Sequence, residues 1–139
     1  MANETLFLPS LREGTKIRLL QSCIALLYTP INEHFGITPL EAMAAGRPVI
    51  SCDNGGPCET VLSGKTGFLV ANTPQVRIVY TVQLNIFSRV CQAFADAMFN
   101  IYGSNSRAHI LGLCARKRVE QMYSFERFAT EVNMLTKVL

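Results

Sequence analysis

An alternation of short apolar runs with helix signals constrains the fold of this 139-residue chain more than any other feature. The first run, IALLY at 24–28, is continuous and ends before Pro30. Such a run is typical of a strand buried on both faces of a parallel sheet. PVISC at 48–52 predicts a second strand and FLV at 68–70 a third. We therefore expect an α/β fold with right-handed crossovers.

The helix between the first two predicted strands has a clear start and stop. Thr38 is a candidate N-cap, Pro39 suits the first helical position, and Glu41 can complete a capping box. The helix is expected to end at Gly46, since glycine tolerates the left-handed conformation that closes many helices.

The remaining elements are predominantly helical. Helical spacing or cap signals predict helices over 11–22, 58–62, 88–101, 104–123 and 124–139, with Ser104 and Ser124 as N-caps. The exception is 76–87, VRIVYTVQLNIF, whose β-branched and aromatic residues favour a strand locally. It does not fit the β/α pattern, and we interpret it as a possible insertion.

Composition excludes several classes of function. Hydrophobic residues make up 49% of the chain and charged residues 17%, which is typical of a globular domain. A net charge of +3 is too small to indicate nucleic-acid binding. The cluster Arg116–Arg118 predicts a solvated helix face, with contact to an anionic membrane as the less favoured alternative.

The five cysteines do not form a zinc pattern. Their number is odd, and we expect them to be reduced thiols in a cytosolic environment. The first residues do not resemble a signal peptide, and no stretch is apolar for long enough to span a bilayer.

Two acids stand out at the predicted ligand end of the sheet. Loops that follow parallel strands meet at one rim, which brings Glu33 and the Gly55-Gly56 turn together. Gly36 allows a ligand to approach the backbone, and the N–H groups that start the next helix favour an anion. Two simpler interpretations stay open: Glu33 is a solvated loop residue, and Glu41 only caps its helix.

These residues resemble a known family. Glu33 and Glu41 are separated by seven residues, Phe35-Gly36 lies between them, and GGPCE at 55–59 and GKTGFLV at 64–70 follow in order. This arrangement resembles the donor-binding motif of retaining GT-B glycosyltransferases. The form YTPINEHFGI at 28–37 is similar to the eukaryotic α-1,3/α-1,6-mannosyltransferases of the dolichol-linked oligosaccharide pathway.

The resemblance implies a role for each matching residue. Glu33 would bind hydroxyls of the donor mannose, positioning the sugar rather than acting chemically, and Glu41 would bind the ribose. The backbone of Phe35, Gly36 and Ile37 would face the sugar and diphosphate. The resemblance also puts Thr38 near phosphate, although its capping duty is the simpler explanation and is sufficient for that residue.

The implied reaction transfers mannose from GDP-mannose to a dolichol-diphosphate-linked oligosaccharide with retention of configuration. No metal or other cofactor is expected. The implied location is the cytosolic face of the endoplasmic reticulum membrane, reached only through a longer form; residues 1–139 themselves are expected to be soluble and cytoplasmic.

The match covers only the second half of a GT-B donor domain, a partial Rossmann-like sheet with flanking helices. We therefore expect residues 1–139 to form one incomplete domain, inactive without an N-terminal GT-B domain as partner. The alternatives are a non-catalytic nucleotide-sugar-binding scaffold and a GT-B transferase with another donor.

Overall fold

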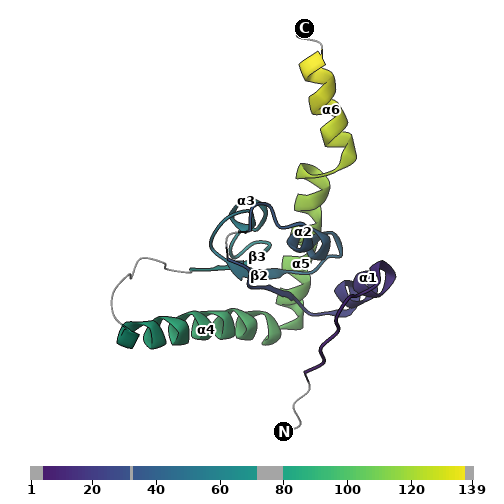
Figure 1. Ribbon diagram of the computed structural model, residues 1–139. Helices are drawn as coiled ribbons and strands as arrows, with labels where there is room; N and C mark the ends of the chain where they lie inside the picture. The colour runs from purple at the N-terminus through teal and green to yellow at the C-terminus, as the bar shows by residue number, and fades with distance from the viewer. Residues whose placement is uncertain (1–4, 32, 72–79, 137–139) are drawn as a thin grey trace.

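The computed structural model describes residues 5–31, 33–71 and 80–136, and for residues 80–88 it describes the backbone only. It confirms the α/β class: three short parallel strands in the order β1-β2-β3 are flanked by helices (Figure 1). The elements are α1 (Glu13–Ser22), β1 (Leu26–Tyr28), α2 (Ile37–Ala44), β2 (Val49–Cys52), α3 (Pro57–Thr60), β3 (Gly67–Val70), α4 (Tyr80–Tyr102), α5 (Asn105–Met122) and α6 (Phe125–Thr136).

The central strand β2 supplies the core on both faces of the sheet. All four of its residues are buried. Ile50 and Cys52 pack with Phe94, Ala97 and Ile101 of α4, on one face. Val49 packs on the other face in a second cluster with Leu20, Ala42, Met43, Val61 and Ala115, from α1, α2, α5 and the end of α3. The sheet is thus the middle layer of an α/β/α arrangement.

The strand β1 departs from the sequence prediction. It lies at the edge of the described sheet and pairs with β2 alone. Ile24 and Leu27 remain 47% and 43% exposed, so the expectation of a strand buried on both faces is wrong. These side chains line an open apolar groove of about 230 Å³ together with Met98 and Tyr102 of α4.

The start of α2 also differs from the predicted capping box. Gly36 is the N-cap, with a left-handed φ of 78°, and no side chain accepts a hydrogen bond there. Since the helix begins at Ile37, Pro39 occupies its third position, where a missing N–H has no intrahelical partner to lose. Thr38 is already inside the first turn, and Glu41 lies two residues beyond the position that a capping box requires. The end was predicted correctly, because Gly46 has a φ of 73°.

The C-terminal helices follow the predicted caps. The Oγ atoms of Ser104 and Ser124 each accept a hydrogen bond at 3.3 Å, from the backbone N–H groups of Arg107 and Arg127. The strand preference of 76–87 is wrong for its described part, because 80–87 belong to α4. Local β propensity is a weak preference that the continuing helix overrides. Residues 76–79 lie outside the described residues.

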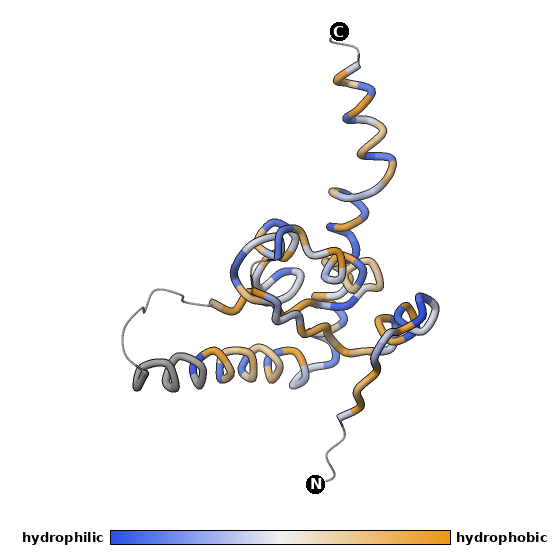
Figure 2. The backbone as a smooth tube through the Cα atoms, in the orientation of Figure 1, coloured by the Kyte–Doolittle hydropathy of each residue, from blue (hydrophilic) through white to orange (hydrophobic). Residues whose placement is uncertain are grey.

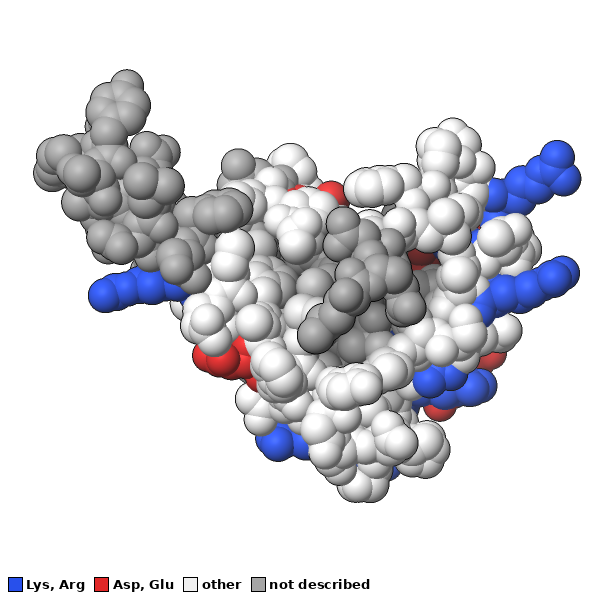
Figure 3. Space-filling model, turned by 90° about the horizontal axis from the view of Figure 1, so that it is seen from below, with Lys and Arg blue, Asp and Glu red and all other residues white. Residues whose placement is uncertain are grey.

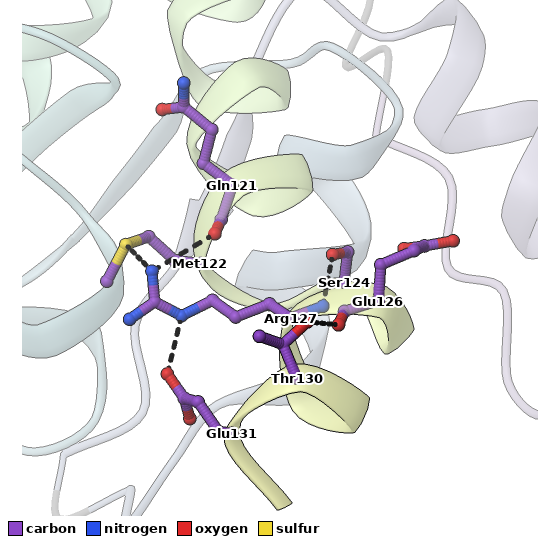
Figure 4. A network of polar contacts seen from close by, with 7 residues as sticks. All are labelled: Gln121, Met122, Ser124, Glu126, Arg127, Thr130 and Glu131. Carbon is purple, nitrogen blue, oxygen red and sulfur yellow. Dashed lines mark hydrogen bonds and ion pairs between the residues drawn. The ribbon is translucent and has the colours of Figure 1, made fainter. Parts of the chain in front are cut away.

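The last helix is joined to the rest through its first turns. Arg127 donates to the Gln121 carbonyl oxygen at 3.4 Å, which links α6 to the end of α5, and to Glu131 Oε1 at 2.9 Å within α6 (Figure 4). No residue of α6 is buried in the described structure. Figure 2 shows apolar and polar residues mixed along this helix, which extends away from the sheet.

Candidate functional site

Two loops meet at the carboxyl end of the sheet, as the sequence predicted. The loop after β1 carries Glu33, and the loop after β2 carries Gly55-Gly56. The backbone N–H of Gly56 donates to the carbonyl oxygen of Glu33 at 2.9 Å. A Cβ on Gly55 would overlap with the Glu33 carbonyl, and a Cβ on Gly56 would overlap with the Phe35 backbone. Glycine is required here because two backbones touch.

Glu33 is half-buried and has a partner that the sequence interpretation missed. The Tyr28 hydroxyl, at the end of β1, donates to Glu33 Oε2 at 3.0 Å. Burial of the Tyr28 ring and the neighbouring carboxylate raise the pKa of this tyrosine above its usual value, so the hydroxyl keeps its proton at neutral pH. The only sequence signal was a polar-tipped aromatic residue that ends a strand.

Glu41 is held by α1. Lys16 donates to Glu41 Oε1 at 2.7 Å and also lies 3.2 Å from Glu13 Oε2. The Lys16 and Glu41 side chains are each about one-third exposed, 31% and 30%. The hydrogen bond to Glu41, followed by the one to Glu13, raises the pKa of Lys16. These three residues line a cavity of about 330 Å³ between α1 and α2. Sequence analysis did not identify Lys16.

The two acids therefore have different partners. Glu33 is oriented from β1 and the Gly55-Gly56 loop, whereas Glu41 lies on α2 against α1. Between them lies the start of α2: among the described residues, which leave out Asn32, no hydrogen bond is seen from the N–H groups of Gly36, Ile37 and Thr38. Such a helix start carries partial positive charge and suits an anion.

The remaining predicted site residues surround this helix start. Gly36 is buried, Thr38 is half-buried, and Ile37 is 67% exposed. The Phe35 ring makes an edge contact with Tyr123, with ring centroids 6.3 Å apart and planes at 76°. Asn32, which belongs to the sequence motif, lies outside the described residues.

A clamp from α5 holds the second loop. Arg118 donates through Nε to the Thr60 carbonyl at 2.8 Å and through Nη2 to the Glu59 carbonyl at 2.7 Å. These carbonyls end the short helix α3, so a cation is well suited to them. The prediction of a solvated Arg116–Arg118 face is therefore wrong for Arg118, while Arg116 is exposed and pairs with Glu120.

The described structure also bears on disulfides, metal-ligand clusters and membrane-spanning helices. All five cysteines are free thiols in this structure. Residues 5–31, 33–71 and 80–136 contain no group of three or more His, Cys, Asp or Glu that could hold a metal ion. Within the same residues no helix combines the length and apolarity needed to cross a membrane.

Comparison with known proteins identifies similar chains. Residues 1–84 match the family described as glycosyl transferases group 1. The chain is 40% identical over its full length to Alpha-1,3/1,6-mannosyltransferase ALG2 from Dictyostelium discoideum. It is 37% identical, over 91% and 96% of its length, to the proteins of the same name from Mus musculus and Homo sapiens. It spans only 29%, 26% and 28% of the length of these three relatives.

The fold also has a counterpart among solved structures. A crystal structure of an S. aureus TarM mutant in complex with Fondaparinux, alpha-GlcNAc-glycerol and UDP matches with a TM-score of 0.62. The match covers 87% of this chain and 22% of TarM, at 22% sequence identity. At this identity the likeness concerns the fold.

Proposed function

Because the chain belongs to the group 1 glycosyl transferases, we propose that it binds GDP-mannose and forms the donor-binding part of a mannosyltransferase. The observation that carries the proposal is the meeting of the Glu33 and Gly55-Gly56 loops beside the uncapped start of α2. That corner offers a carboxylate to sugar hydroxyls and backbone N–H groups to a diphosphate. The choice of mannose as the sugar rests on the similarity to three mannosyltransferases.

Each part of the donor has a proposed partner. Glu33 accepts hydrogen bonds from hydroxyls of the mannose. The N–H groups of Gly36, Ile37 and Thr38 receive the diphosphate, and the Phe35 backbone borders the sugar. Glu41 accepts hydrogen bonds from the ribose hydroxyls, and Lys16 keeps its contact with Glu13. Glu33 orients the sugar and takes no part in bond breaking, which makes its contribution one of positioning.

The proposed reaction is transfer of mannose, with retention of configuration, to a dolichol-diphosphate-linked oligosaccharide through an α-1,3 or α-1,6 linkage. The departing GDP gains negative charge, which the N-terminus of α2 stabilises without a metal ion. Turnover requires the acceptor site of a further, N-terminal domain, and that longer form works at the cytosolic face of the endoplasmic reticulum membrane.

Calorimetric titration of the chain with GDP-mannose, UDP-glucose and ADP-glucose tests this function. Saturable binding of GDP-mannose, tighter than that of the other two and unchanged by EDTA, is the expected result. Glu41→Gln should weaken binding of GDP itself, whereas Glu120→Gln, at an exposed position of α5, serves as a matched control and should not. Preference for another nucleotide sugar would contradict the mannosyl assignment, and no binding at all would favour a scaffold role.

A further inference from the structure

Glu33, which is proposed to bind the sugar, is held through both its main chain and its side chain. Its backbone carbonyl accepts from the Gly56 N–H at 2.9 Å, which fixes the path of the loop. Its Oε2 accepts from the Tyr28 hydroxyl at 3.0 Å, which fixes the side chain. A Glu side chain in a loop would otherwise sample several rotamers, and a ligand that ordered it would lose part of its binding free energy.

The tyrosine that makes this contact is itself rigidly placed. Tyr28 is the last residue of β1, and its register partner is Ser51 of the fully buried strand β2. Its ring packs with Leu26 against the cluster that contains Met43 and Val49. The half-buried ring therefore packs against the core while its hydroxyl reaches Glu33, an arrangement that tyrosine suits because it is amphipathic. Side chains on strands hold a site more precisely than side chains on loops.

We propose that Tyr28 is the positioning residue of the donor-sugar site: its hydroxyl fixes Glu33 Oε2 and leaves Oε1 to accept a sugar hydroxyl. The proposal rests on the proposed function, which it deepens. The oxygen that is left belongs to a carboxylate, which makes strong hydrogen bonds as an acceptor. The raised pKa of Tyr28 is consistent with a hydroxyl that stays protonated beside this carboxylate.

Selectivity for the sugar part of the donor distinguishes this role from a general structural one. Tyr28 contacts the residue proposed to bind mannose, whereas the proposed nucleotide contacts lie on α2. Removing the hydroxyl should therefore weaken binding of GDP-mannose and leave binding of GDP unchanged. A variant that only loosened the fold would weaken both ligands.

The experiment compares dissociation constants of GDP and GDP-mannose by calorimetry for five proteins: the unmodified chain, Tyr28→Phe, Glu33→Gln, the double variant and Tyr102→Phe. Tyr28→Phe keeps the packed ring and removes only the hydroxyl. Tyr102→Phe removes the same group from an exposed residue of α4, 72% accessible, and is the matched control. Melting temperatures recorded in parallel verify that each variant is folded.

The expected result is about a tenfold weaker affinity of Tyr28→Phe for GDP-mannose, with GDP affinity within about twofold of the unmodified chain. The double variant should bind no more weakly than Glu33→Gln alone, because Tyr28 acts through Glu33. Unchanged GDP-mannose affinity in Tyr28→Phe, or an equal loss for both ligands, would overturn the inference while leaving the proposed function intact.

A chain that binds neither GDP nor GDP-mannose would instead overturn the proposed function, and the inference with it. The hydrogen bond has its own spectroscopic readout as well. Glu33→Gln should lower the midpoint of one tyrosine in an ultraviolet pH titration, because the carboxylate that disfavours ionisation of Tyr28 is gone. An unchanged titration would count against the contact itself.

Discussion

The close contact between the two site loops depends on the absence of a side chain at Gly56. Its conformation, φ −54° and ψ −39°, is one that any residue adopts, so the need for glycine is purely steric. A Cβ there would overlap with the carbonyl oxygen, the carbonyl carbon and the Cα atom of Phe35. Neighbouring backbone cannot move away as a flexible side chain can, and the Glu33 loop would therefore have to shift.

Gly56→Ala is expected to destabilise the fold by about 1–3 kcal/mol, the usual cost of overpacking a closed contact. Gly14→Ala is the matched control, because a Cβ on this residue of α1 would meet no atom within 4 Å. That change should stabilise the protein by about 0.5–1 kcal/mol, as alanine replaces glycine within a helix. Urea denaturation measures both. An equal response of the two variants would show that the loops do not touch at Gly56.

At the scale of elements, α5 is the connection between the sheet and the site. It contacts β3 and the helices α2 and α4, and its Arg118 binds the carbonyls that end α3. Tyr123, directly after α5, donates to the same Glu59 carbonyl at 3.4 Å and touches the Phe35 ring. The two site loops are therefore supported from the same helix, which lies far from them in sequence.

Arg118→Met should lower the free energy of unfolding by about 1.5–3 kcal/mol, because two hydrogen bonds from a charged donor are lost. The Thr60 carbonyl loses its partner, and the Glu59 carbonyl keeps only the longer bond from Tyr123. Arg118→Lys should recover only part of this, since lysine lacks the planar fork. Arg116→Met, two residues away, removes an exposed ion pair to Glu120 and should cost less than about 1 kcal/mol. Thermal unfolding distinguishes them, and equal losses for the two methionine variants would refute the clamp.

What the sequence could predict follows from how local each signal is. The strand β2, the stop at Gly46 and the caps Ser104 and Ser124 depend on a few neighbouring residues, and they were predicted correctly. The convergence of the two loops was also predicted, because parallel strands impose it.

The site contacts that the sequence did not reveal join distant segments. The pair of Lys16 and Glu41 connects residues 25 apart, and the Arg118 clamp connects residues 58 and 59 apart. Neither leaves a periodic signal. The N-cap of α2 was misplaced because the motif of Thr38, Pro39 and Glu41 fits a capping box in composition, while the left-handed turn at Gly36 starts the helix earlier.

At the scale of the whole molecule, apolar side chains of β1 and α4 are exposed on one face. Viewed from below, most of the described surface that is visible carries no charge, and Lys and Arg lie mostly toward its margins (Figure 3). The groove of Ile24, Leu27, Met98 and Tyr102 opens at the β1 edge. An exposed strand edge beside apolar side chains promotes association between chains.

The chain is therefore expected to self-associate at high concentration, and Leu27→Lys should shift it toward the monomer by introducing a charge into the groove. Ile110→Lys, at a 59% exposed position of α5 outside that groove, is the control and should leave the distribution unchanged. Sedimentation velocity over a range of concentrations provides the measurement. An unmodified chain that stays monomeric throughout would contradict the prediction.

The main-chain hydrogen bond from Gly56 to Glu33 has a consequence for substitutions of Glu33. It uses the main-chain oxygen of residue 33, which every amino acid possesses, so the path of the loop does not depend on which side chain stands there. If Glu33 binds the donor sugar as proposed, a substitution at this position would change the contact with the sugar and leave the path of the loop in place. In the proposed function, contact with the ligand and the path of the loop thus depend on different atoms of one residue.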